Sequence, residues 1–351
     1  MQNNKPIITA IITTYRRPQL LRRAIRSVLN QTYPYLKVLV CDDASNDETA
    51  KVVAELMQAD PRVIYHYHPK NIGMVANYNF GLSQVETPYF SILSDDDVIL
   101  PNFYADAMIY FEKYPKAMIV GGVTVEINKE GKVFYPAAYS WEKELYVEPP
   151  QSFLQYSIYH HFPHIDGTIY RQEIIKEVGL FDSTLPRTCD LDYALRLSSR
   201  FPYVMFPNLC AIFKPHNQSV SVLNASTLIL KEFPKLIQKV SEDKIIPSDI
   251  RNLGIEALKK AYGSITFRAG LVFTAKGNFR EGLEAASLLK QLYKYRWKAL
   301  GLKLIVKNSQ YFKPLHRLVI WAYQFWKTRT SRITATFDAQ EYEKLAKYLE
   351  L

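Results

Sequence analysis

The alternation of strand-like and helix-like segments in the first half of the chain constrains its fold more than any other feature. Four short apolar runs are typical of buried strands: Ile7–Ile12, Val38–Cys41, Val63–Tyr67 and Tyr89–Leu93. Apolar residues at helical spacing lie between the runs. Because this order repeats as β-α-β-α, the sequence predicts an α/β fold with a mostly parallel, doubly wound sheet flanked by helices.

Local residue chemistry predicts where some of these helices begin. Pro18 is suited to the first turn of a helix, where its missing N–H costs nothing. Ser45 or Asn46 is suited to cap the next helix. Pro101 is expected to start a further helix that reaches about Tyr114.

Polar residues follow three of the predicted strands at the point where each strand ends. Thr13–Tyr15 follows the first strand, Asp42–Asp43 the second and Asp95–Asp97 the fourth. Ligands of doubly wound sheets bind beyond the carboxyl ends of the strands. The sequence therefore predicts a ligand site that these three segments share.

Two explanations account for the three adjacent carboxylates Asp95–Asp97. Their mutual repulsion is costly at a strand end, and a divalent cation shared with substrate phosphates would remove that cost. A solvated acidic turn that caps the following helix would also explain them. Asp42 and Asp43 also allow both a structural and a binding explanation. One of them suits an Asx turn, and the other suits hydrogen bonds to a nucleobase or ribose.

A further pair of carboxylates, Asp190 and Asp192, stands at the start of an apolar, helix-like run. The dipole of a helix stabilises negative charge at its N-terminus, so capping explains at least one of them. A carboxylate at the mouth of a site is also the usual general base for a hydroxyl group.

Taken in order, these motifs resemble the family 2 glycosyltransferases of the GT-A fold over roughly residues 5–222. The matching segments are Ile11–Arg17, Ser27–Tyr33, Cys41–Asp47, Asn71–Gly73 with Asn77 and Asn79, Leu93–Asp97, Ile165–Arg171, Val178–Asp182, Asp190–Arg196 and Lys214–Ser221. The chain departs from the family pattern in three places. Ser94 replaces the first Asp of the "DxD" motif, Cys189 replaces a Glu, and Tyr78 replaces an Arg.

The resemblance implies a role for each of several side chains. Asp190 is the expected catalytic base. Nucleotide binding is expected of Thr13, Tyr15, Asp42, Asp43 and Asp95. Asp96 and His216 are expected to bind a divalent metal, Mn²⁺ or Mg²⁺. Contacts with the donor or acceptor sugar are expected of Asp166, Gly167, Asp192 and Arg196.

The expected reaction is transfer of a sugar, with inversion, from a nucleoside diphosphate sugar. UDP is the commonest donor nucleotide in the family. The expected acceptor is a hydroxyl of a glycan or lipid-linked glycan in cell-surface polysaccharide synthesis. One alternative is a catalytically weak module that only binds sugar nucleotides. A nucleic-acid-binding protein is a weaker alternative, because the chain has no zinc-ligand spacing or recognisable RNA motif.

Charge divides the chain into two regions of different character. Residues 226–351 contain 23 Lys and Arg against 11 Asp and Glu, whereas residues 1–225 contain 21 against 23. We expect residues 1–225 to form the catalytic domain and residues 226–351 to form a basic, aromatic-rich helical region. Such a region suits contact with a membrane surface or packing on a second subunit.

Cysteine usage and hydropathy indicate the compartment. The three cysteines have no metal-ligand spacing and suggest a reducing environment. The first residues lack a basic segment typical of a signal peptide, and no apolar stretch approaches the ~18 residues that span a bilayer. We therefore expect a cytoplasmic protein, with peripheral contact to the inner face of the cell membrane through the C-terminal region.

Overall fold

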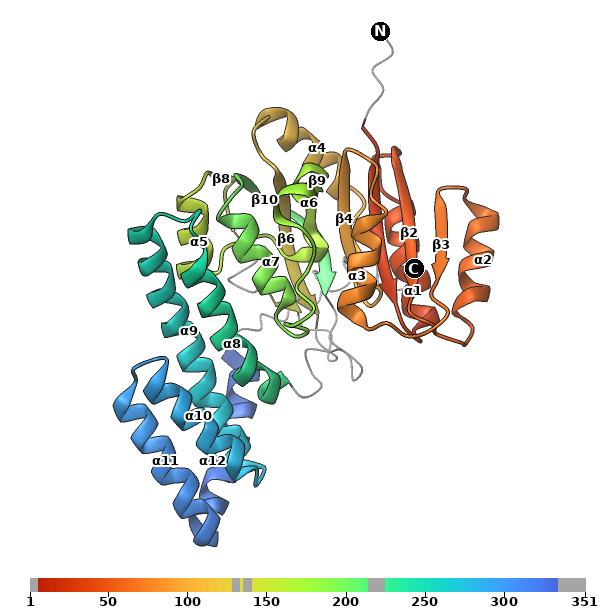
Figure 1. Ribbon diagram of the computed structural model, residues 1–351. Coiled ribbons are helices and arrows are strands. Elements are labelled where there is room, and N and C mark those ends of the chain that lie inside the picture. Colours follow the sequence, from red (N-terminus) through yellow and green to blue (C-terminus); the bar gives the residue numbers. More distant parts are fainter. Residues whose placement is uncertain (1–5, 128–132, 135–140, 214–224, 334–351) are drawn as a thin grey trace. The chain divides into compact units, whose positions relative to one another are not determined.

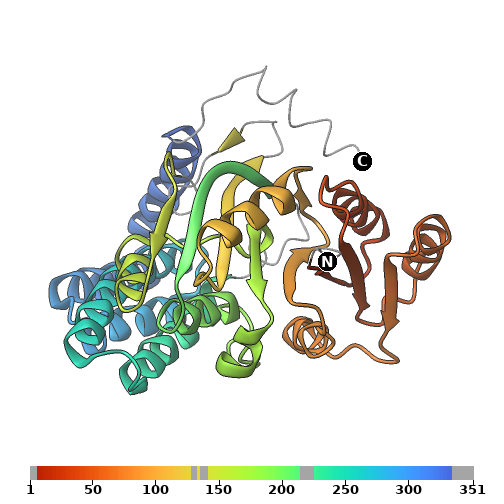
Figure 2. The ribbon, with the colours of Figure 1, turned by 90° about the horizontal axis from the view of Figure 1, so that it is seen from above.

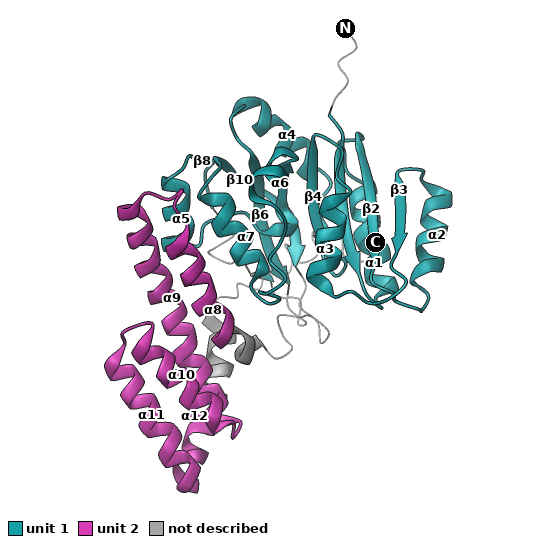
Figure 3. Ribbon diagram, viewed as in Figure 1, with its two compact units in different colours: residues 1–219, 336–351 teal, residues 220–335 magenta. Residues whose placement is uncertain are grey.

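The computed structural model of the protein describes residues 6–127, 133–134, 141–213 and 225–333 (Figure 1). These residues fall into two compact units (Figure 3). The N-terminal unit contains the described residues up to Phe213, and the C-terminal unit contains those from Ala225 to Ile333. Each unit has a buried apolar core of its own.

A sheet of ten described strands forms the centre of the N-terminal unit. The strands are β1 (Ile8–Thr14), β2 (Leu36–Asp42), β3 (Val63–Tyr67), β4 (Tyr89–Ser94), β5 (Val98–Ile99), β6 (Ile119–Ile127), β7 (Val133–Phe134), β8 (Leu145–Val147), β9 (Thr168–Arg171) and β10 (Tyr203–Phe213). They lie in the order β3-β2-β1-β4-β9-β6-β10-β5, with β7 beside β6 and β8 beside β10.

The strand directions divide the sheet into a parallel part and a mixed part. The strands β3, β2, β1 and β4 all run parallel, as the alternation in the sequence predicts. Strand β9 runs antiparallel to both of its neighbours, β4 and β6, while β6 and β10 are parallel. The predicted α/β fold with parallel strands is confirmed, and β9 makes the sheet mixed.

Helices connect the strands and cover both faces of the sheet (Figure 2). They are α1 (Pro18–Leu29), α2 (Thr49–Ala59), α3 (Met74–Ser83), α4 (Phe103–Lys113), α5 (Gln151–Tyr159), α6 (Glu173–Val178) and α7 (Cys189–Ser198), with a 3₁₀ turn at Ile165–Gly167. The faces follow from the alternation of side chains along β1. Ile8, Ala10 and Ile12 pack in one core with α1 and α4, whereas Ile11 faces α3.

The start of α2 differs from the expected cap at Ser45 or Asn46. This helix begins only at Thr49, because the preceding loop leaves helical geometry at Ala44 and Asn46, which have positive φ angles of 59° and 51°. The Ser45 hydroxyl instead accepts a hydrogen bond from the Arg16 N–H, at 2.8 Å. Helix α4 likewise begins at Phe103, two residues after the expected Pro101.

The C-terminal unit is helical throughout its described part. Its helices are α8 (Ala225–Glu242), α9 (Ser248–Ala275), α10 (Phe279–Gln291), α11 (Arg296–Tyr311) and α12 (Lys313–Ile333). The long helix α9 contacts each of the other four. In the described part of the chain, no helix is both long and apolar enough to cross a membrane.

Gly81 of α3 allows this helix to pack closely on β1. A Cβ atom at Gly81 would lie only 2.4 Å from Cγ2 of the fully buried Ile11. Ile11 cannot easily move, because it is β-branched and sits inside a buried strand. We predict that Gly81→Ala lowers the free energy of unfolding by about 1–3 kcal/mol through overpacking.

The matched control for this substitution is Gly301→Ala in α11, where a Cβ atom would have no neighbour within 4 Å. This variant should be unchanged or more stable by up to about 1 kcal/mol, because alanine favours a helix over glycine. Urea denaturation measures both variants. Equal stability of the two would contradict the packing argument.

Candidate active site

The register of the parallel strands brings the predicted polar segments to one edge of the sheet. Thr14 of β1 pairs with Asp42 of β2, and Thr13 pairs with Ser94 of β4. The three strands therefore end at the same level. As the sequence predicts, Thr13, Asp42–Asp43 and the acidic turn Asp95–Asp97 meet at the carboxyl ends of these strands.

Arg17 bridges two carboxylates of the acidic turn. One of its terminal nitrogens lies 2.9 Å from Oδ1 of Asp95 and 3.2 Å from Oδ2 of Asp96. The hydroxyl of Thr14 donates a further hydrogen bond to Oδ2 of Asp95, at 2.7 Å. These carboxylates are thus neutralised in part by a side chain of the protein itself. The sequence contains the signal for this, since Arg16–Arg17 directly follows the first strand, whereas the prediction from sequence named only a divalent cation or a solvated turn.

The two partners of this ion pair respond differently to their burial. Burial raises the pKa of Asp95 to about 6, helped by the neighbouring Asp96, and outweighs the opposing effect of Arg17 and Thr14. For Arg17, burial lowers the pKa, but Asp95 and Asp96 outweigh it and leave the pKa above its ordinary value. The guanidinium therefore stays charged while Asp95 exchanges its proton near pH 6.

A second arginine, Arg23 of α1, also faces the acidic turn. A terminal nitrogen of its guanidinium donates to the backbone carbonyl of Asp96. Burial lowers the pKa of Arg23, while Asp97, Asp96 and Asp95 act in the opposite direction. The edge of the sheet therefore holds two cations of the chain next to three carboxylates.

Asp42 and Asp43 each accept hydrogen bonds from the surrounding chain. Asp42 accepts from the Ser45 N–H at 2.9 Å, which is the expected turn, and from the Tyr65 hydroxyl at 2.6 Å. Asp43 accepts from two successive backbone N–H groups, those of Ile72 at 2.6 Å and Gly73 at 3.0 Å. Both carboxylates thereby fix the loops around the strand ends, and Asp43 anchors the segment that leads into α3.

Asp166 reaches the acidic turn from the 3₁₀ turn before β9. Its Oδ1 accepts a hydrogen bond from the Ser94 N–H at 2.7 Å, and its Oδ2 lies 3.0 Å from Nδ1 of His164, an ion-pair distance. Burial would raise the pKa of Asp166, but His164 and the Ser94 N–H outweigh it and hold the pKa below its usual range. The adjacent Gly167 packs tightly, since a Cβ atom there would lie 2.6 Å from the Thr124 hydroxyl.

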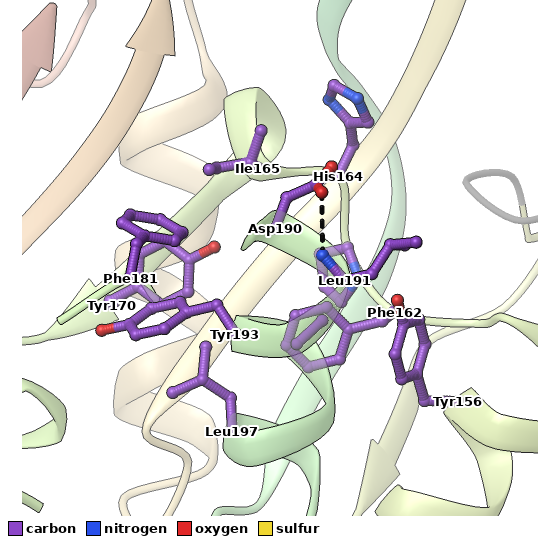
Figure 4. A pocket seen from close by; sticks show the side chains of 12 residues that line it. Tyr156, Phe162, His164, Ile165, Tyr170, Phe181, Asp190, Leu191, Tyr193 and Leu197 are labelled. Atoms are coloured by element: carbon purple, nitrogen blue, oxygen red, sulfur yellow. Dashed lines mark hydrogen bonds between the residues drawn. The ribbon is translucent and has the colours of Figure 1, made fainter. Parts of the chain in front are cut away.

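Asp190 lies at the start of α7, beside a pocket walled mainly by aromatic side chains (Figure 4). Its Oδ1 accepts a hydrogen bond from the Leu191 N–H at 2.8 Å. The residue keeps contact with solvent, whereas the other candidate site aspartates are buried. The dense pocket wall nevertheless raises the pKa of Asp190 by desolvation, against the opposing effects of the Leu191 N–H and His164.

Asp192 and Arg196 form an ion pair one turn apart on α7. The Nε and a terminal nitrogen of Arg196 both lie 2.8 Å from Oδ2 of Asp192. The same guanidinium donates to the carbonyl groups of Val178 at 2.7 Å and Leu180 at 2.9 Å. In this arrangement the pair holds the loop after α6 against α7.

Asn79 lies on α3, which packs on β1 and β2, and joins the same loop to this part of the sheet. Its side-chain amide donates to the Phe181 carbonyl at 2.9 Å and accepts from the Phe181 N–H at 2.8 Å. The sequence marks Asn79 as part of a motif but not as the partner of Phe181, which lies about a hundred residues further along. Of the other predicted residues, Tyr15 exposes 40% of its surface beside the strand ends, and His216 lies outside the described residues.

The raised pKa of Asp95 predicts how stability depends on pH. Because the folded pKa of about 6 exceeds the ~3.9 of a free Asp side chain, the folded state holds this proton more tightly. The resulting stabilisation is complete below about pH 4 and is lost as the pH rises through about 6. Asp95→Asn does not titrate at this position. Relative to this variant, the free energy of unfolding of the native protein should fall by about 2 kcal/mol between these two pH values.

The control for this prediction is Asp60→Asn. Hydrogen bonding to Arg62 lowers the pKa of Asp60. The free energy of unfolding of the native protein, relative to that of Asp60→Asn, should therefore rise with pH instead of falling. Urea denaturation at a series of pH values measures both differences. Parallel stability curves for native protein and Asp95→Asn would contradict the assignment.

Comparison with known proteins identifies the family. Residues 9–179 match glycosyl transferase family 2. Chondroitin synthase of Escherichia coli is 24% identical over 254 residues, which are 72% of this chain and 34% of that protein. The GalNAc(5)-diNAcBac-PP-undecaprenol beta-1,3-glucosyltransferase of Campylobacter jejuni is 36% identical over 96 residues, which are 27% of this chain and 31% of that protein. The chain thus spans about a third of the length of each of these two relatives.

The fold comparison agrees with the sequence comparison. S. aureus TarS 1–349, solved in complex with UDP-GlcNAc, superposes with a TM-score of 0.63 at 16% identity, covering 87% of this chain and 93% of that one. That likeness extends over the sheet and the helical C-terminal region. Family match and fold together confirm the predicted family: residues 9–179 belong to glycosyl transferase family 2, and the chain has the GT-A fold.

Proposed function

We propose that the protein transfers a sugar from a UDP-sugar, with inversion, to a hydroxyl of a glycan or lipid-linked glycan. The observation that carries this proposal is the position of Asp190. It is the solvent-accessible carboxylate of the site, stands beside a small pocket with aromatic side chains in its wall, and has a raised pKa. A raised pKa brings a carboxylate closer to the operating pH, which strengthens it as a general base.

In the proposed reaction, a carboxylate oxygen of Asp190 takes the proton from the acceptor hydroxyl. The acceptor oxygen forms a bond to the anomeric carbon as the bond from that carbon to the diphosphate oxygen breaks. The nucleoside diphosphate leaves with the bonding electron pair and needs neutralisation of charge rather than a proton. Because attack and departure occur on opposite faces of the sugar, the configuration at the anomeric carbon inverts.

The nucleotide is proposed to lie at the carboxyl ends of β1, β2 and β4. Asp42 and Asp43 accept bonds from the chain but retain lone pairs for a ribose or base. The Arg16 guanidinium lies 5.0 Å from the centre of the Tyr15 ring, and the remaining exposed surface of the ring would stack on the base, with Thr13 nearby at the end of β1. Asp95, held by Thr14 and Arg17, would form the floor of the site near the diphosphate.

The residues at the acidic turn fit a divalent metal that arrives with the nucleotide. Among the described residues, no three His, Cys, Asp or Glu side chains are grouped to hold an ion by themselves. Mg²⁺ is commonly bound by one or two carboxylates together with substrate phosphates, and Asp96 is placed to supply one. Bound Mn²⁺ or Mg²⁺ would supply positive charge to the leaving diphosphate. Arg17 and Arg23 supply fixed positive charge at the same edge.

The acceptor side is proposed to lie around the pocket beside α7. Between this pocket and the acidic turn, the donor sugar would contact Asp166 and Gly167. Asp166 is held there by Ser94 and His164, and Gly167 is closely packed. Asp192 and Arg196 would act by holding the loop at the pocket wall. The resemblance to a chondroitin synthase and to a glucosyltransferase named for an undecaprenol-linked substrate supports a polysaccharide or lipid-linked acceptor. Residues 1–225 would carry this chemistry at the cytoplasmic side of a membrane.

The first test replaces the proposed base. Asp190→Asn should reduce sugar transfer by roughly 10²–10⁴-fold while leaving UDP affinity unchanged, because the amide cannot accept the proton. Asp243→Asn in the C-terminal unit is the control and should transfer sugar as the native protein does, since Asp243 also accepts a backbone N–H, that of Ile245 at 3.1 Å, and lies outside the proposed site. UDP release from a panel of UDP-sugars with added acceptors measures transfer. Full activity of Asp190→Asn would exclude it as the base.

The second test concerns the metal. Asp96→Ala should abolish the dependence of UDP affinity on Mn²⁺, and affinity in the presence of Mn²⁺ should fall about tenfold or more. Titration calorimetry with UDP, with and without Mn²⁺, measures this effect. If Mn²⁺ strengthens UDP binding equally in the variant and the native protein, Asp96 is not a metal ligand.

A further inference from the structure

Helix α11 carries a stripe of apolar side chains on its solvent-facing side. Trp297, Leu300, Leu304 and Tyr311 expose 85%, 47%, 52% and 83% of their surfaces. Their spacing of three, four and seven residues places them on one face of the helix. Exposure of two large aromatic residues and two leucines in one row is unusual for a solvated helix.

The opposite face of α11 already provides the packing that the C-terminal unit needs. Ala299, Leu302 and Val306 are buried there. Leu302 lies against Gly270 of α9, and Val306 lies against Gly282 of α10. The outer stripe therefore serves no packing role in the described part of this unit.

Basic residues lie along one side of the stripe. At 3.6 residues per turn, Lys303 and Lys307 fall beside it, whereas Lys298 lies about 130° around the helix from its centre, and all three are exposed. From Arg296 to Ile333, the two helices α11 and α12 contain nine Lys and Arg and no Asp or Glu. Exposed apolar residues continue beyond α11 with Phe312 and Leu318, at 59% and 55%.

These features favour one kind of partner. Protein interfaces are depleted in lysine, whereas Trp and Tyr beside Lys and Arg are typical of segments that lie at a membrane surface. The absence of acidic residues from α11 and α12 complements a negatively charged surface. A helix with an apolar stripe beside lysines presents its rings to the acyl boundary and its ammonium groups to the phosphates.

We propose that α11 and α12 form a docking surface for a bilayer that contains anionic phospholipids. Trp297, Leu304 and Tyr311 enter the headgroup region, and Lys303 and Lys307 contact lipid phosphates. The helix lies along the surface and does not span it, in agreement with its length and charge. This docking does not depend on the transfer chemistry, although it would bring the enzyme to a membrane-borne acceptor.

The test uses the full chain and vesicles of phosphatidylcholine, alone or mixed with an equal amount of phosphatidylglycerol. The native protein should sediment with the mixed vesicles at low salt and be released at about 1 M salt, where screening is nearly complete. Trp297→Ser with Leu304→Ser should weaken vesicle binding at least tenfold. Leu253→Ser, at a residue of α9 that is 58% exposed, is the control and should bind as the native protein does.

Charge is tested separately. Lys303→Glu with Lys307→Glu should abolish binding to the mixed vesicles. Lys260→Glu with Lys276→Glu makes the same change of net charge at exposed positions elsewhere in the unit and should retain most of the binding. None of these residues belongs to the proposed active site, so hydrolysis of the UDP-sugar in the absence of vesicles should be unchanged in every variant.

Three results would overturn the proposal. One is failure of the native protein to bind anionic vesicles. Another is equal loss of binding in the two charge-reversal pairs, which would show an effect of net charge alone. The third is a native homodimer that does not bind vesicles and dissociates on Trp297→Ser with Leu304→Ser, which would make the stripe a contact between two copies.

Discussion

The central strand β1 is the constraint on which the N-terminal unit depends. All its residues are buried, and it pairs in parallel with β2 on one side and β4 on the other. Because side chains alternate across the sheet, a shift of one residue would exchange the side chains that pack with α1 and α4 for those that pack with α3. The same register sets the level at which Thr14, Asp42 and Ser94 end their strands. Burial of an apolar strand therefore determines where the polar groups of the active site lie.

Much of this arrangement could be predicted from the sequence, because strands buried on both faces have a distinct composition. The isoleucine-rich β1, the polar residues at the strand ends and the helix beginning at Pro18 all follow from local rules. The antiparallel direction of β9 could not be predicted in this way. It depends on pairing with β4 and β6, and no local pattern in four residues specifies such neighbours.

The side-chain partners of the acidic turn were also beyond local reasoning. Arg17 is near Asp95 only because β1 and β4 are neighbours, although the two residues are 78 positions apart. Asp166 joins Ser94 across 72 positions for a similar reason. Sequence patterns placed the carboxylates of the acidic turn at a strand end, but the balance of burial and charge at each carboxylate requires the folded arrangement. Asp95 and Asp166 illustrate this, since both are buried while the pKa of Asp95 is raised and that of Asp166 is lowered.

The paired hydrogen bonds between Asn79 and Phe181 have a mechanical consequence. The side-chain amide of Asn79 forms hydrogen bonds with both the N–H and the C=O of Phe181, as the backbone of a neighbouring strand would. Separating α3 from the loop before α7 would break both bonds at once. These two bonds therefore hold the loop against α3 at this point. Any movement of the loop that keeps both bonds must hinge at other positions, with Asn79 on the stationary side.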